Sequence, residues 1–332
     1  KFINYTIHDS FRVLTTFSSA FLIFLLLREI VNKFNFISVL FVTLFFTETF
    51  YALFPFLRFL FNNSFFVEIA SIDTELIEGF GSNPNITAAS ILIKFPFFLY
   101  FIYSINFPKK IIFLLPIFFT FLLLLLLGSR ASFISLIFQI LLFIIFLFYK
   151  KKYLKLPIFV LSLFTPFLLA YIYTSNFIIQ DSAVSQLSSI QITNQSSSNR
   201  FLLWEHTLNY LVDNPLGCGF GNWKIQSIPY WKEMGGAYQV PYHAHNDFLE
   251  VFAELGYFGG IIYSFIFIFI LFKFLFGFFK KNSVPDFIFF LALCSYIIDA
   301  LLNFPLERPL MQFSFSVLFA FYLLGSNSYK NS

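Results

Sequence analysis

Apolar runs of membrane-spanning length recur along this chain of 332 residues. A helix that crosses the hydrocarbon core of a bilayer needs about 20 mostly apolar residues. Nine segments meet this requirement: 11–27, 36–57, 86–105, 111–127, 131–149, 156–174, 256–279, 285–303 and 309–325. Each run is continuous rather than alternating, which excludes the strands of a membrane barrel. The sequence therefore predicts an all-α, polytopic membrane helix bundle.

The composition agrees with a lipid environment. Hydrophobic residues make up 58% of the chain and charged residues only 11%, whereas a soluble domain carries about 25% charged residues. The sequence begins at Lys1 rather than Met, so we expect further spans upstream. Cys218 falls in a polar loop and Cys294 in an apolar run, which disfavours a disulfide or a metal framework.

Basic residues alternate with the predicted spans and indicate the topology. One side of the membrane receives Arg28, Lys33, Lys109, Lys110, Lys150, Lys151, Lys152, Lys155, Lys280, Lys281 and Lys330. The other side receives Glu68, Asp73, Glu75, Glu78 and a long polar loop. Because cytoplasmic loops carry an excess of Lys and Arg, we place the C-terminus inside. The chain then divides into spans one to six (1–174), a large extracytoplasmic loop with short helices (175–255), and spans seven to nine with a cytoplasmic tail (256–332).

The long loop contains one amphipathic segment. Ser198 or Asn199 is a suitable helix cap, and the following apolar residues recur at helical spacing: Phe201, Trp204, Leu208 and Leu211. This stripe predicts a short helix lying on the membrane or on the bundle, ending before Pro215. The glycines of the next stretch, "PLGCGFGNW", indicate a tight turn. Their spacing is not that of a dinucleotide-binding loop, and no strand precedes them.

The stretch "VPYHAHNDFLEVFAELGYFGG" holds two of the four histidines, His243 and His245. They are interfacial polar residues, metal ligands, or groups that transfer a proton or donate a hydrogen bond to an anion. A metal would need further ligands from His206, Asp247 or Glu250, which makes it the weaker interpretation. An imidazole with a pKa near 6.5 suits proton transfer at neutral pH. His245 shares a helix face with Leu249 and Phe252, which predicts that His245 begins a short helix.

Arg130, Arg200 and Arg308 all fall on the outer side of this topology. Arg130 and Arg308 lie at ends of apolar runs, where snorkelling to the interface explains them equally well. Arg200 is also compatible with a solvated loop position. If two or three of them converge on one pocket, their planar guanidinium groups would bind a diphosphate.

Glu48 and Lys94 are ionisable residues within predicted spans, where a charge needs a partner or a wet cavity. Glu48 and Lys94 are each about 12–14 Å below the outer end of consecutive antiparallel helices, at about 1.5 Å per residue. Equal depth predicts a salt bridge between them. The alternative is that Lys94 snorkels alone and that Glu48 is protonated.

Four motifs in order carry a family resemblance: "GFGSNPNITAASIL", "GSRAS", "NRFLLWEHTLNYLVDNPLGCGFGNW" and "HAHNDFLEVFAELGYFGG". Together they resemble the O-antigen ligase and polymerase superfamily over roughly residues 48–260. The resemblance implies a GT-C-like membrane glycosyltransferase. Such an enzyme takes a glycan from a polyprenyl diphosphate carrier at the outer face of the bacterial inner membrane.

The same resemblance implies roles for individual residues. Arg130 and Arg200 match the diphosphate-binding positions, and His245 matches the catalytic residue that acts on the acceptor hydroxyl. His243 lies off the motif as a neighbour, and we give His243, Asn246 and Arg308 supporting roles. No metal or other cofactor is implied. The expected partners are the lipid-linked glycan donor, the acceptor and membrane lipids, with no nucleic acid.

The acceptor remains open at this point. An O-antigen ligase uses lipid A–core, a polymerase uses another lipid-linked repeat, and a protein O-oligosaccharyltransferase uses a protein. A polysaccharide flippase or transporter belongs to a different class, in which internal repeats and paired charges at mid-membrane are expected. We see no internal repeat, and the polar residues concentrate in one outer loop, which favours an enzyme.

Overall fold

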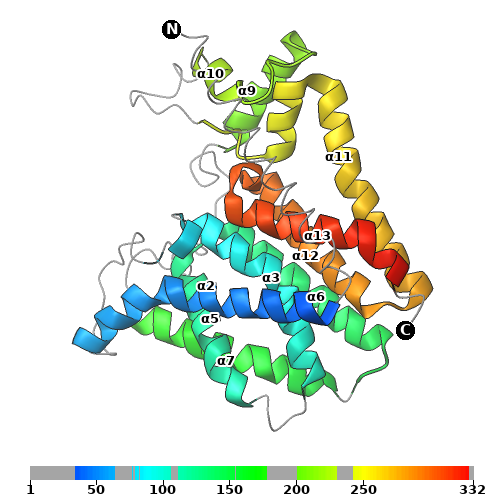
Figure 1. The fold of residues 1–332 in the computed structure, drawn as a ribbon. Coiled ribbons are helices and arrows are strands. Elements are labelled where there is room, and N and C mark those ends of the chain that lie inside the picture. The colour runs from blue at the N-terminus through cyan, green and yellow to red at the C-terminus, as the bar shows by residue number, and fades with distance from the viewer. Residues whose placement is uncertain are drawn as a thin grey trace. The chain divides into compact units, whose positions relative to one another are not determined.

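The computed structural model describes residues 34–63, 77, 79–81, 83–105, 111–153, 155–177, 200–229 and 242–328. Its helices are α2 (Phe34–Asn63), η2 (Gly79–Gly81), α3 (Pro84–Ser104), η3 (Ile111–Phe113), α5 (Leu114–Leu127), α6 (Arg130–Tyr149), α7 (Lys155–Phe177), α9 (Arg200–Asp213), α10 (Trp223–Gln226), α11 (Asp247–Lys281), α12 (Val284–Leu302), η5 (Pro305–Glu307) and α13 (Pro309–Ser328) (Figure 1). These ranges contain no strand, which confirms the all-α class.

Six of the described helices are long and apolar enough to cross a membrane: α2, α3, α6, α7, α11 and α12. Two more of the predicted spans are shorter apolar helices, α5 and the first part of α13. The predicted span 11–27 lies outside the described residues. The chain is therefore a multi-pass membrane protein, and eight of the nine predicted runs coincide with helices.

The described helices fall into two compact units. The scaffold unit contains α2, α3, α5, α6, α7 and the start of α12 up to Ser295. The loop unit contains α9, α10, α11, η5, α13 and the end of α12 from Tyr296.

An aromatic seam and one ion pair join α2 to α3 in the scaffold unit. Phe45 stacks on Phe98 at a centroid distance of 4.9 Å. The Lys94 Nζ lies 3.0 Å from both carboxylate oxygens of Glu48. Ser90 joins the pair, because its hydroxyl donates to Glu48 at 2.9 Å and accepts from Lys94 at 2.8 Å. The predicted salt bridge is thus confirmed, with both side chains buried.

A proline in α3 creates a contact with α6. Pro96 has no N–H, so the carbonyl of Leu92 four residues earlier loses its helical partner. The Gln139 side chain of α6 donates to that carbonyl at 3.1 Å. Gln139 also donates to Ser135, whose hydroxyl lies 2.7 Å from that of Ser295 on α12. Polar contacts therefore satisfy the carbonyl that the proline leaves without its helical partner.

In the loop unit, α11 is two helical segments joined at Gly256. This glycine has φ 69° and ψ −174°, which no α-helix contains, and α11 bends sharply there (Figure 1). The glycine turn 215–221 docks on the bend: Cys218 and Gly219 donate to the carbonyls of Ala253 and Glu254 at 3.0 and 2.8 Å. On the other side of the bend, the Tyr257 N–H donates to the Pro215 carbonyl at 3.1 Å. The predicted turn therefore holds the two segments of α11 together.

Helix α9 begins at Arg200 and ends before Asn214, as the amphipathic pattern predicted. Its buried face differs from the predicted stripe and consists of Leu203, Thr207, Tyr210 and Leu211. Phe201 and Leu208 of the predicted stripe are each 48% exposed. The reason is that Tyr210 packs edge-on against the buried Trp223 at 5.4 Å, which rotates the neighbouring face inward.

Candidate active site

The histidine stretch forms a turn that ends where α11 begins. The Asn246 side chain accepts a hydrogen bond from the Leu249 N–H at 3.1 Å, so Asn246 is the N-cap of α11. His245 therefore lies before the helix, and the prediction that it begins the helix is wrong. Its φ of 51° is left-handed, a conformation that costs about 1 kcal/mol or more for a residue with a Cβ.

Two carboxylates of α11 fasten this turn. Glu250 accepts from the Ala244 N–H through Oε2 at 2.8 Å. Asp247 accepts from the Leu306 N–H at 2.8 Å, which ties the start of α11 to η5. Both acidic side chains are buried, and each provides a backbone N–H with a hydrogen-bond partner. The backbone around the histidines is consequently held from two directions.

The ring of Phe304 lies among three of the predicted site residues. His243 stacks on it at a centroid distance of 4.1 Å, with 13° between the planes. His245 meets the same ring edge-on at 5.1 Å. The Arg308 guanidinium carbon lies 4.4 Å from the ring centroid, within the range of a cation–π contact. The ring of Phe304 is thus in contact with two imidazoles and one guanidinium.

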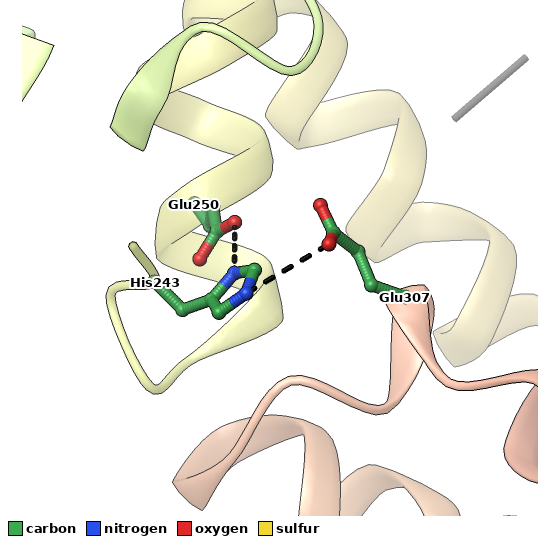
Figure 2. Close-up of side chains that lie close together, drawn as sticks. All are labelled: His243, Glu250 and Glu307. Carbon is green, nitrogen blue, oxygen red and sulfur yellow. Dashed lines mark hydrogen bonds and ion pairs between the residues drawn. The ribbon is translucent and has the colours of Figure 1, made fainter. Parts of the chain in front are cut away.

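His243 lies between two carboxylates (Figure 2). Its Nδ1 is 3.0 Å from Oε1 of Glu250, and its Nε2 is 3.7 Å from Oε2 of Glu307. Burial alone would lower the pKa of His243. The hydrogen bond and the charge of Glu250, together with the charge of Glu307, outweigh burial and the opposing charge of Arg308, so the pKa of His243 is raised. His243 is thereby favoured as an imidazolium.

The same three side chains raise the question of a metal, because ligand atoms of His243, Glu250 and Glu307 all lie within 4.8 Å of one another. In Figure 2 the two carboxylates face opposite nitrogens of one ring. A metal ion binds only one nitrogen of a histidine, with zinc–ligand distances of about 2.0–2.2 Å. The observed arrangement is that of an imidazolium between two acids, and it would have to rearrange to hold a metal.

His245 has the opposite electrostatic setting. Burial, followed by the positive charges of Arg200, His243 and Arg308, lowers its pKa to about 4. Its Nδ1 is buried and has no hydrogen-bond partner among the described residues. At neutral pH His245 is therefore an uncharged imidazole with an unused nitrogen, surrounded by cations.

Arg200 begins α9 and points to the end of α12. Its Nη2 donates to Oδ1 of Asn303 at 3.2 Å, and the Asn303 Nδ2 donates in turn to Oδ1 of Asp299. Asn303 directly precedes Phe304, so the same short segment contacts Arg200 on one side and the histidines and Arg308 on the other.

The structure brings five of the six predicted site residues into the loop unit: Arg200, His243, His245, Asn246 and Arg308. Arg130 begins α6 in the scaffold unit, so its place in a common cavity with Arg200 and His245 stays a prediction. The sequence interpretation missed Asp299, Asn303, Phe304 and Glu307. Asp299 carried a usable signal, because it is an ionisable residue in an apolar run, as Glu48 is.

Residues 115–264 match the family model described as O-Antigen ligase. This match supports the O-antigen ligase superfamily. It also supports a membrane glycosyltransferase family of the ligase or polymerase type. The matched region includes Arg130, Arg200 and His245 and ends before Asn303. No curated protein and no solved structure matches the chain.

Proposed function

We propose that this protein is an O-antigen ligase, which moves a glycan from a polyprenyl diphosphate carrier to lipid A–core. The observation that carries the proposal is a neutral imidazole set among cations, whose buried Nδ1 has no hydrogen-bond partner in the part of the chain that the structure describes. His245 contacts the Phe304 ring that Arg308 also covers, and the charges of Arg200 and Arg308 act on it. Glycan transfer from a diphosphate carrier needs both a base for the acceptor hydroxyl and anion-binding groups for the diphosphate leaving group in one place.

The arginines are suited to the leaving group. A diphosphate offers several oxygens with negative charge, and guanidinium groups bind such oxygens in bidentate geometry. Arg200 is the first residue of α9, and Arg308 directly follows η5, so the two guanidinium groups come from different elements. The proposal assigns them, with Arg130 of the scaffold unit, to the donor diphosphate.

His245 is assigned to the acceptor. The acceptor hydroxyl oxygen attacks the anomeric carbon of the donor glycan and forms a new glycosidic bond. The bond between that carbon and the phosphate oxygen breaks, and the polyprenyl diphosphate leaves with the electron pair. The hydroxyl proton passes to the free nitrogen of His245, a role in which a general base contributes about 10²–10⁴ in rate.

The charges around His245 link donor binding to basicity. Burial first, and then the charges of Arg200, His243 and Arg308, lower the pKa of His245 to about 4, so the imidazole is uncharged but weakly basic. A bound diphosphate would offset the positive charges, and an anion nearby raises the pKa of an imidazole. Donor binding would then make His245 a stronger base.

The location follows from the same proposal. The basic residues of the short connections indicate a cytoplasmic C-terminus. Helix α9 and the histidine turn before α11 then face the periplasm from the bacterial inner membrane, where a lipid-linked glycan meets lipid A–core. The GT-C-like chemistry requires no cofactor, and the residues that we assign to it are all side chains of this chain.

A deletion strain tests the proposal. A ligase predicts that lipid A–core loses all O-antigen while lipid-linked polymer accumulates at the outer face of the membrane. Lipid A–core capped with single repeats would show a polymerase instead, and an unmodified glycoprotein would show a protein transferase. Accumulation of the lipid-linked glycan at the cytoplasmic face would contradict all three and show a flippase.

A further inference from the structure

The end of α12 holds a string of polar groups that terminates at Arg200. Asp299 and Asn303 are both only 7% exposed. The Asn303 backbone N–H donates to the Asp299 carbonyl at 2.7 Å, and the Asn303 side chain joins the Asp299 carboxylate to the Arg200 guanidinium. Both residues lie outside the region 115–264 that matches the family model.

The chemistry of this string decides which way the amide of Asn303 faces. A carboxylate oxygen accepts hydrogen bonds, so the Asp299 carboxylate takes the NH₂ end of the amide. The carbonyl oxygen of the amide is then turned toward Arg200, where it accepts from Nη2. Arg200 consequently has one of its five donor positions fixed by a buried group.

Asn303 is a neutral partner of Arg200, and this matters for a residue that binds an anion. A carboxylate in the place of Asn303 would neutralise the guanidinium and compete with a diphosphate. An amide orients the guanidinium and leaves its positive charge in place, while the remaining donors keep the planar fork geometry that suits phosphate oxygens. The acid is kept one step further away, at Asp299.

We propose that Asp299 and Asn303 are positioning residues for the donor diphosphate, acting through Arg200. This inference rests on the proposed function, because it assumes that Arg200 binds the diphosphate. It assigns part of donor recognition to α12, beyond the family-matched segment. Neither residue is expected to touch the donor itself.

Donor binding and turnover test this assignment in the purified, detergent-solubilised protein. Asn303→Ala should raise the KM for the lipid-linked donor about tenfold, as expected for the loss of a hydrogen bond to a charged group. The KM for the acceptor should stay unchanged. The Kd of a short-chain polyprenyl diphosphate without a glycan should rise by the same factor, while the binding of the corresponding polyprenol should not change.

A double-mutant cycle separates positioning from general damage. If Asn303 acts through Arg200, Asn303→Ala should have no further effect on diphosphate binding in an Arg200→Ala background. Asp299→Asn, which keeps the shape of the side chain, is the second variant should Asn303→Ala fail to fold. It should raise the same Kd about threefold, and again only when Arg200 is present.

Two substitutions of the same kind serve as controls. The first control is Asp286→Asn, because Asp286 lies on the first turn of the same helix α12. The second is Asn62→Ala, because Asn62 is exposed at the end of α2. Both should bind the diphosphate like the wild type. If Arg200→Ala weakens diphosphate binding but Asn303→Ala and Asp299→Asn do not, the positioning role is wrong and the proposed function stands. If Arg200→Ala itself binds like the wild type, the assigned diphosphate site is wrong and the positioning role falls with it.

Discussion

Lys94 in the scaffold unit and His245 in the loop unit are both buried ionisable side chains, but their surroundings differ. Lys94 reaches a carboxylate, a hydroxyl and a carbonyl within 3.0 Å. His245 has a left-handed backbone, an unpartnered nitrogen and three cationic neighbours. The first arrangement satisfies every donor of the ammonium group and stabilises the bundle. The second keeps strain and unused hydrogen-bonding capacity, which is common where a ligand completes the site.

The largest effect should come from His245→Ala. Loss of the base should lower the transfer rate about 10²–10⁴-fold. Folding should not suffer, because the substitution removes an unsatisfied buried nitrogen. His245→Gly should even raise the melting temperature, since glycine adopts φ 51° without strain.

The rate is measured with the purified enzyme, and folding with its melting temperature in the same detergent. His206→Ala on α9 is the matched control and should keep activity. Wild-type turnover by His245→Ala would end the assignment of the base. Turnover that is lost on exhaustive chelation and restored by zinc would instead favour the metal interpretation of His243, Glu250 and Glu307.

The next largest effect should be on the stability of the scaffold unit. Lys94→Met leaves the buried Glu48 carboxylate without its cation, which should cost about 3–5 kcal/mol of unfolding free energy. The double variant Lys94→Met with Glu48→Gln removes both charges and should recover most of that loss. Denaturant titration in mixed micelles measures both. Equal stability of the single variant and the wild type would show that the pair does not stabilise the bundle.

These two regions also differ in how far the sequence predicted them. Run length indicated the helices, and equal depth on neighbouring spans was enough to predict the pair of Glu48 and Lys94. Asn246 caps α11, and its side-chain hydrogen bond places His245 outside the helix. The periodicity of apolar residues in a sequence does not show which residue forms the cap. Phe304 joins the site from a segment about 60 residues later in the chain, and only tertiary packing places it there.

His243 illustrates the same limit. Its position off the family motif suggested a neighbour of His245, and the sequence placed Glu250 near it only as a possible metal ligand. The structure shows that Glu250 binds both the His243 ring and the Ala244 N–H, because the turn before the cap folds back over the first turn of α11. The sequence showed that these residues are close along the chain, but it did not show the direction in which each side chain points.

A smaller loss of stability should follow Gly217→Ala. A Cβ at this position would lie 2.4 Å from the Glu254 carbonyl oxygen, at a residue with φ 78°. Backbone cannot move aside as a side chain can, so we expect about 1–3 kcal/mol of destabilisation and a displaced α11 bend. Gly219→Ala also has a positive φ, but its Cβ would meet only the Asn222 side chain at 3.0 Å.

Melting temperatures of the two glycine variants should therefore differ in a fixed order, with Gly217→Ala the lower. Transfer activity should follow the same order, because the bend carries the helix that begins after His245. Equal melting temperatures would mean that the close approach of Gly217 to α11 destabilises Gly217→Ala no further than the positive φ destabilises both variants.

The smallest effects should appear in how stability depends on pH, where the two histidines contribute in different ranges. The folded pKa of His243 is raised above its unfolded value of about 6.5. The folded protein then holds this proton more tightly, so the stabilisation by Glu250 and Glu307 is full below about pH 6.5 and is lost as pH rises through the raised pKa. The folded pKa of His245 is lowered to about 4. Its unfolded form takes up a proton first, so stability falls as pH drops from about 6.5 to about 4.

Single glutamine variants separate these contributions in melting curves between about pH 4 and pH 9. The advantage of the wild type over His243→Gln should shrink above about pH 6.5, from an initial value on the order of 1 kcal/mol for a hydrogen-bonded ion pair. The loss of stability in acid should become shallower in His245→Gln. If the stability advantage of the wild type over His243→Gln grew with pH, His243 would be neutral in the folded protein. Glu250 and Glu307 would then need another cation as their partner.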